Sequence, residues 1–115
     1  MYSLVGRIDE ADRLRRLDQP RDWKHKIGEK SDYWASVIDG HRMFIKLCPG
    51  GRLHAHTDDA EPKTHVVLQT NPQAMSRSGS TVTALEQGGI YTMDPKIEHE
   101  SWNNGTTDRI HYILS

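Results

Sequence analysis

From Asp32 to its last residue, the sequence consists of short β-rich runs separated by turn residues at intervals of about ten positions. Glycine, proline, asparagine and aspartate close the runs, and this spacing is typical of an all-β sandwich or barrel. Seven or eight short antiparallel strands in one small domain predict a jelly roll. We therefore expect an all-β fold, built as a jelly roll, over residues 32–115.

The clearest local prediction is a hairpin formed by residues 33–38 and 43–47. Asp39-Gly40 follows the first run, and an Asp-Gly pair is a preferred two-residue hairpin turn because both positions tolerate positive φ. Residues 64–69 form another expected strand, with His65 and Val67 on one face and Val66 on the other. Further strands are expected at 53–56, 81–85, 90–93, 97–102 and 109–114.

Before residue 32, the sequence predicts one short N-terminal helix. Apolar residues recur at three-residue steps over residues 8–17, Asp9 can cap the first turn, and Pro20 stops the helix. Residues 19–31 combine many charges with proline and glycine, which indicates a connecting segment. We therefore expect a single domain over 1–115, with the helix and connecting segment in 1–31 and the jelly roll in 32–115.

The charge balance argues against two classes of protein. With 27% charged residues and a formal net charge of -1, the chain lacks the composition of a disordered protein and the basic excess of a nucleic-acid-binding one. Basic residues gather between Arg13 and Lys30, but acidic residues lie among them. We interpret this segment as a solvated helix face, with a partner surface as the alternative.

Two features of the sequence bear on the compartment. The single cysteine, Cys48, cannot form an internal disulfide, which favours a reducing cytoplasm. The first five residues lack the features of a signal peptide, and no apolar run approaches the roughly 20 residues of a membrane span. We expect a cytoplasmic protein with neither membrane nor nucleic acid as partner, and the oligomeric state is left open.

The candidate chemistry lies in a His-x-Asp pair and a distant histidine. His56 and Asp58 lie two residues apart, so a continuing strand would direct both side chains to the same side. His99 follows about forty residues later and can complete a set of two histidines and one carboxylate. Non-haem Fe(II) oxygenases use such a set, and a zinc hydrolase can use it as well with water in the open position.

Arg109 bears on the choice between these metals. It follows His99 by ten residues, on the next expected strand across a turn at residues 103–105. A hairpin would bring the two side chains together, and the guanidinium fork suits a dicarboxylate that chelates the metal at its other end. The alternative is an exposed strand residue that pairs with Asp108 or Glu100.

Three segments of the chain resemble the aspartyl/asparaginyl β-hydroxylase family. They are PGGRLHAHTD at 49–58, THVVLQTNP at 64–72, and the stretch from Gly89-Ile90-Tyr91 through His99 and Asn103 to Arg109-Ile110-His111. The resemblance implies a 2-oxoglutarate-dependent oxygenase with a double-stranded β-helix fold, with hydroxylases of free proline among its relatives. It covers about Pro49 to Leu114, roughly the last sixty per cent of the chain.

Carried over by position, the resemblance implies a set of site residues. Fe(II) would be held by His56, Asp58 and His99, and Arg109 would receive the distal carboxylate of 2-oxoglutarate. His65 would help to hold the carboxylate nearer the metal. Lys63 stands where the family commonly has arginine, and it keeps the charge without the bidentate geometry. No catalytic residue is expected beyond the metal ligands.

We therefore expect an enzyme, a dioxygenase that uses Fe(II), 2-oxoglutarate and dioxygen to hydroxylate a C–H bond of an amino acid or of a protein Asp/Asn-type side chain. One alternative is a cupin-like metal enzyme without 2-oxoglutarate, and another is a non-catalytic jelly-roll binding module. His54 is expected to share a face with His56, as a partner of the site or as an exposed strand residue. His111 is expected on the face of Arg109, lining the pocket or packed in the core.

Overall fold

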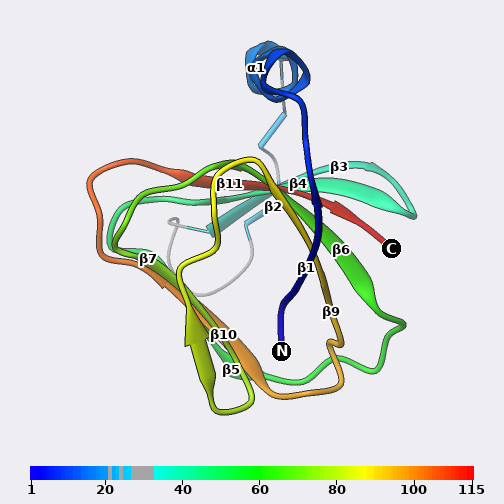
Figure 1. Ribbon diagram of the computed structural model, residues 1–115, viewed down its shortest axis with the longest axis vertical. Coiled ribbons are helices and arrows are strands. Elements are labelled where there is room, and N and C mark those ends of the chain that lie inside the picture. Colours follow the sequence, from blue (N-terminus) through cyan, green and yellow to red (C-terminus); the bar gives the residue numbers. More distant parts are fainter. Residues whose placement is uncertain (21, 24, 27–32) are drawn as a thin grey trace.

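Two antiparallel sheets face each other in the computed structural model, and one short helix lies outside them (Figure 1). The structure describes residues 1–20, 22–23, 25–26 and 33–115. The elements in these residues are β1 (Ser3–Arg7), α1 (Glu10–Asp18), β2 (His25–Lys26), β3 (Tyr33–Asp39), β4 (Arg42–Leu47), β5 (Arg52–His56), β6 (Lys63–Gln69), β7 (Ala74–Ser78), β8 (Thr81–Thr83), β9 (Gly89–Met93), β10 (His99–Asn103) and β11 (Arg109–Leu114).

The strand order confirms the predicted jelly roll, the double-stranded β-helix. The large sheet has the order β1-β9-β6-β11-β4-β3-β2, and the small sheet has the order β5-β10-β7-β8. Successive strands β9, β10 and β11 alternate between the two sheets, as they do in this fold. The expected strands form with ends within two residues of the predicted ones, and β7 is an additional strand.

The central strands β6 and β11 of the large sheet are buried on both faces, and this explains their apolar composition. On β6, Val66 and Leu68 face outward into a cluster under the helix, while His65 and Val67 face the space between the sheets. The predicted alternation along this strand is therefore confirmed. Figure 1 shows α1 on the side of the large sheet away from β5, β7 and β10. Core side chains fill part of the space between the sheets, and a pocket occupies another part of it.

The helix has the expected cap, but the apolar face expected to be buried is partly exposed, and Arg13 is buried instead. Asp9 precedes it, and the Asp9 side chain accepts hydrogen bonds from the backbone N–H groups of residues 11 and 12 at 2.8 and 3.4 Å. Leu14 is 49% exposed, whereas Arg13 is buried and donates from Nη1 to the Leu68 carbonyl at 2.7 Å. The solvated-face interpretation is therefore wrong for Arg13, because its side chain is buried against the Leu68 carbonyl near the end of β6.

The N-terminal segment contributes more to the sheet than the sequence predicted. Strands β1 and β2 lie before residue 32, where we expected only a helix and a connecting segment, and each forms one edge of the large sheet. Within that connecting segment, residues 21, 24 and 27–31, which include the basic residues Arg21, Lys24 and Lys30, lie outside the described residues. No helix among the described residues has the length and apolar character needed to cross a membrane.

The first predicted hairpin forms, with a shifted turn. Strands β3 and β4 pair antiparallel, and Asp39 is the partner of Arg42, so residues 40 and 41 make the turn. Neither Asp39 nor Gly40 has a positive φ. The Asp39 carboxylate accepts a hydrogen bond from the His41 N–H at 2.8 Å instead, and this side-chain contact stabilises the turn.

The second predicted hairpin, between the strands of His99 and Arg109, is wrong. Strand β10 pairs with β5 and β7 in the small sheet, whereas β11 pairs with β4 and β6 in the large one. Buried Asn103 makes the crossing between them: its Nδ2 donates to the Leu47 and Thr107 carbonyls at 2.9 and 2.8 Å. Its Oδ1 accepts from the Gly105 N–H and the Asn71 amide at 3.0 and 3.1 Å. The side chain of Asn103 therefore ties the two sheets together.

Asn103→Ala should lower the free energy of unfolding by about 2–4 kcal/mol, because it leaves several buried polar groups without partners. The neighbouring side chain of Asn104 is exposed, so Asn104→Ala is the matched control and should change stability by less than about 0.5 kcal/mol. Urea unfolding followed by tryptophan fluorescence measures both. Equal stability of the two variants would contradict this role of Asn103.

Candidate metal centre

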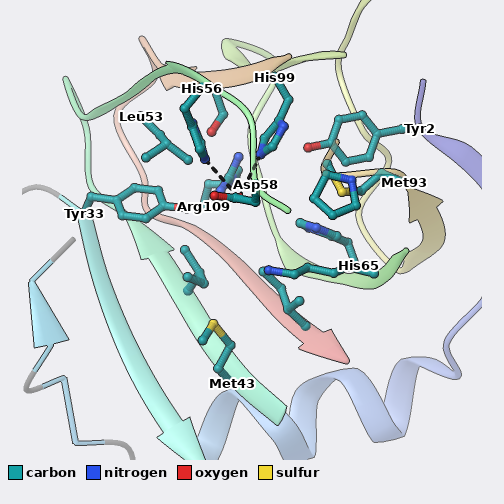
Figure 2. A pocket seen from close by; sticks show the side chains of 15 residues that line it. Tyr2, Tyr33, Met43, Leu53, His56, Asp58, His65, Met93, His99 and Arg109 are labelled. Carbon is teal, nitrogen blue, oxygen red and sulfur yellow. Dashed lines mark ion pairs between the residues drawn. The ribbon is translucent and has the colours of Figure 1, made fainter. Parts of the chain in front are cut away.

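Three side chains, two from the small sheet and one from the segment after β5, meet at one end of the space between the sheets. His56 is the last residue of β5, Asp58 follows two residues later, and His99 is the first residue of β10. Asp58 Oδ2 lies 3.3 Å from His56 Nε2 and 3.6 Å from His99 Nε2. One ligand atom from each residue lies within 4.8 Å of the other two, so the group can hold a metal ion. Figure 2 shows Asp58 between the two rings.

A β-bulge sets the direction of His56. In the pairing of β5 with β10, His56 lies opposite His99 and Leu53 opposite Ser101, so three steps on β5 match two on β10. Leu53 and His56 therefore both line the pocket, whereas His54 is exposed. The expectation that His54 shares a face with His56 is wrong for this reason.

Asp58 reaches the histidines although β5 has already ended. The prediction assumed that the strand would continue through residue 58, but β5 ends at His56. The Asp58 N–H instead donates to the Pro95 carbonyl at 2.8 Å, which holds this segment against the loop before β10. This backbone hydrogen bond, and not a continuing strand, therefore places the Asp58 carboxylate beside the two histidines.

The backbone also determines which ring nitrogen of each histidine is available. His56 Nδ1 lies 2.8 Å from the His54 carbonyl oxygen, and His99 Nδ1 lies 2.8 Å from the Ile97 carbonyl oxygen. A carbonyl only accepts, so each Nδ1 carries the proton and each Nε2 presents a lone pair. Histidine ligands of metals are held in this way, with the ring nitrogen that does not bind the metal donating to a carbonyl that fixes the orientation of the ring. Two imidazoles and a carboxylate fit Fe(II), and they fit zinc as well.

A pocket of about 370 Å³ extends from the three side chains into the space between the sheets. The small sheet contributes the candidate metal ligands, while the large sheet contributes cationic and aromatic side chains on the facing wall. Figure 2 shows Tyr2 and Tyr33 on opposite sides of this pocket. The lining residues are Tyr2, Tyr33, Met43, Ile45, Leu53, His56, Asp58, Lys63, His65, Met93, Pro95, His99, Ser101, Arg109 and Ile113.

Arg109 lies inside the pocket, where the Tyr33 hydroxyl is a hydrogen-bonding neighbour of its guanidinium. It is 5% exposed, its Nη1 is 3.5 Å from Ser76 Oγ, and its buried Nε has no hydrogen-bond partner. Within the described parts of the chain, no carboxylate lies within 4.0 Å of its guanidinium. The alternative of an exposed arginine is therefore wrong, and Glu100 pairs instead with Arg52 and Arg77. A buried cation of this kind favours an anionic ligand.

His65 and Lys63 also face the pocket from β6. The sequence analysis expected both side chains near the site. Burial lowers the pKa of His65 to about 3, and the nearby charges of Arg109 and Lys63 act in the same direction. His65 is therefore neutral at physiological pH. His111 lies on the same face of β11 as Arg109 but is fully buried and does not line the pocket, so the core alternative is confirmed for it.

Two tyrosines are among the pocket residues that the sequence analysis did not name as site residues. Tyr33 alternates inward on β3, a signal that was used only for the hairpin, and burial raises its pKa while the charge of Arg109 opposes the rise. Tyr2 lies just before β1 and packs edge-on against His65 with 5.6 Å between ring centroids. Burial also raises the pKa of Tyr2. Nothing in the N-terminal sequence indicates that it reaches the pocket.

Comparisons with known proteins bear on both the family and the fold. The family model described as aspartyl/asparaginyl beta-hydroxylase matches residues 34–115. A search of curated proteins finds no match. The structure is similar to the plu4264 protein from Photorhabdus luminescens, with a TM-score of 0.64 and 19% identity over 85% of each chain.

Two further solved structures carry the fold in their descriptions. A conserved protein with a double-stranded β-helix domain from Klebsiella pneumoniae has a TM-score of 0.58 and 20% identity, over 76% of this chain and 79% of that one. A cupin 2 conserved barrel domain protein from Salinispora arenicola has a TM-score of 0.58 and 12% identity, over 77% and 79%. At these identities the likeness shows the cupin fold alone.

Proposed function

This chain belongs to the aspartyl/asparaginyl β-hydroxylase family, and on that premise we propose that it is an Fe(II)- and 2-oxoglutarate-dependent dioxygenase. It would hydroxylate a C–H bond of an amino acid or of a protein Asp/Asn-type side chain. One observation carries the proposal: a His-Asp-His cluster shares a pocket with a buried arginine that has no carboxylate partner among the described residues. A metal ion and a dicarboxylate together would satisfy both groups.

His56, Asp58 and His99 would hold the iron through two Nε2 atoms and one carboxylate oxygen. When bound, Fe(II) supplies the activation of dioxygen, with 2-oxoglutarate as the reductant that leaves as succinate and carbon dioxide. The two Nδ1 hydrogen bonds keep both rings oriented before the metal arrives. The two imidazoles would therefore need little reorientation when the metal binds.

Arg109 would bind the distal carboxylate of 2-oxoglutarate through its planar fork, and Lys63 and His65 would contact the end nearer the metal. Ser76 Oγ, 3.5 Å from Arg109 Nη1, orients the guanidinium from the small sheet. Aliphatic side chains of the large sheet and Leu53 exclude water from the remaining wall. Because the other pocket residues bind the co-substrate or exclude water, no catalytic residue is proposed beyond the three metal ligands.

The proposal includes the setting and the partners of the enzyme. The substrate is a free amino acid or a protein side chain, and neither nucleic acid nor a membrane is a partner. A cytoplasmic setting agrees with a sequence that contains one cysteine, Cys48.

The test is turnover of the co-substrate. Purified protein with Fe(II), 2-oxoglutarate and air should produce succinate, and the anaerobic complex should show a metal-to-ligand charge-transfer absorption in the visible range. Folded, metal-loaded protein that gives neither signal would refute the proposed function. Candidate substrates are then ranked by how much each accelerates succinate formation, first as free amino acids and then as Asp- and Asn-containing peptides.

A second candidate is a cupin-like metal enzyme that does not use 2-oxoglutarate, because two imidazoles and a carboxylate also fit zinc. The two candidates differ in their need for an organic acid. Tight metal binding without any binding of 2-oxoglutarate, measured by calorimetry on the Zn(II)-loaded protein, would favour this second candidate.

A further inference from the structure

A pair of buried histidines lies behind the pocket wall. His65 Nδ1 on β6 is 3.1 Å from His111 Nδ1 on β11, and the two ring planes are nearly perpendicular, at 88°. His111 is 0% exposed, and its Nε2 has no hydrogen-bond partner. His65 lines the pocket, and its Nε2 is the ring nitrogen that His111 does not use.

Both rings are neutral, since burial lowers the pKa of each and the nearby charge of Arg109 opposes protonation. A neutral imidazole has one N–H and one lone pair, so a bond between two Nδ1 atoms allows two arrangements. Either His111 donates and His65 carries its own proton on Nε2, or His65 donates and His111 carries its proton on Nε2. The two arrangements differ in whether the buried His111 Nε2 carries a proton and in whether His65 Nε2 presents an N–H or a lone pair to the pocket.

The unpartnered Nε2 of His111 separates these arrangements. In the second one, this fully buried atom would be an N–H without an acceptor, and such orphaned donors are rare in proteins. In the first one, it is only an unused lone pair. We propose that His111 donates its Nδ1–H to His65 and so fixes His65 as a neutral Nε2–H donor toward the pocket.

His111 is then a positioning residue that acts through His65. A neutral imidazole with a free lone pair would repel an anionic ligand, whereas an Nε2–H donates a hydrogen bond to it. The large sheet would thus offer an anion a neutral donor beside the charges of Lys63 and Arg109. The ligand, 2-oxoglutarate, rests on the proposed function, but the protonation pattern of the pair does not.

The pattern can be observed directly by long-range ¹H–¹⁵N correlation NMR of the full-length, histidine-labelled protein at pH 7, without metal and with Zn(II). We expect His65 as the Nε2–H form and His111 as the Nδ1–H form. His56 and His99 provide internal references, because their carbonyl contacts require Nδ1–H. An Nδ1–H form of His65 with an Nε2–H form of His111 would overturn the inference, whether or not the protein turns over 2-oxoglutarate.

Two variants of His111 separate positioning from packing. In His111→Phe the ring volume remains but the donor is lost, so the Kd of the Zn(II)-loaded protein for 2-oxoglutarate should rise about tenfold. In His111→Asn the side-chain amide can donate in the same place, so the Kd should stay within about threefold of the original. The Kd for Zn(II) should be unchanged in both.

A purely structural role predicts the reverse order, because phenylalanine fills a buried site and asparagine leaves a cavity there. Weaker 2-oxoglutarate binding by His111→Asn than by His111→Phe would therefore contradict the inference. Thermal unfolding identifies a variant that does not fold, and in that case the NMR result on the unmodified chain still decides. Expected tautomers in a chain that binds no 2-oxoglutarate would support the assignment of His111 while refuting the proposed function.

Discussion

Replacing His99 with alanine should reduce succinate formation below detection and weaken metal binding by more than about 100-fold, because loss of a partner that only orients a ligand already costs about 10- to 100-fold. His99 offers one of the two imidazole nitrogens and is only 8% exposed, so water does not readily take its place with the same geometry. Titration with Fe(II) under anaerobic conditions measures the binding, and succinate release measures turnover.

The matched control is His54→Ala, which removes a histidine from the same strand pair but from the exposed side of the bulge. It should leave both metal affinity and succinate formation within about twofold of the original, as for most exposed substitutions. If His99→Ala binds metal as tightly as His54→Ala does, the three side chains are not the ligand set. Circular dichroism of both variants shows whether each is folded.

Replacing Arg109 with methionine should change binding and stability in opposite directions. The Kd for 2-oxoglutarate should rise at least about 30-fold, since truncating one partner of a buried charge pair costs about 2–5 kcal/mol. The ligand-free protein should keep its free energy of unfolding or gain about 1 kcal/mol, because a buried cation without a carboxylate partner among the described residues is replaced by an apolar side chain. Calorimetric titration and urea unfolding measure the two quantities.

Arg109→Lys serves as the control for charge. Lysine keeps a cation on the same wall but has no planar fork, so its affinity for 2-oxoglutarate should fall between those of the original protein and Arg109→Met. Metal affinity should be the same in all three, because the candidate metal ligands lie on β10, at the end of β5 and in the segment after it, away from β11. A loss of stability in Arg109→Met without a loss of 2-oxoglutarate binding would identify Arg109 as a structural residue.

The sequence predicted well wherever a local period decides the structure. On β6, alternate burial separates His65 from Val66, and both assignments follow from a period of two. The metal cluster was also within reach, because one strand end and one distant strand start each present a histidine. Its geometry depends on a β-bulge, however, and the alternation of an uninterrupted strand assigned His54 to the wrong face.

Long-range pairing was the part that the sequence could not supply. A turn signal at Asn103 indicates that the chain turns, but not whether the next strand returns to the same sheet, and here it crosses to the other one. Strand β7 went unpredicted because Ser76 and Ser78, which it turns inward, have no marked strand preference. Ser76 is inside because it faces Arg109, a contact between residues of different sheets.

The separation of the pocket into two walls has an evolutionary consequence. The candidate metal ligands come from β5, β10 and the residues after β5, whereas Lys63, His65 and Arg109 come from β6 and β11. Substitutions that reshape the second wall therefore leave the first intact. If the proposed function holds, a lineage with this architecture can exchange one organic acid for another, step by step, while the candidate metal ligands stay unchanged.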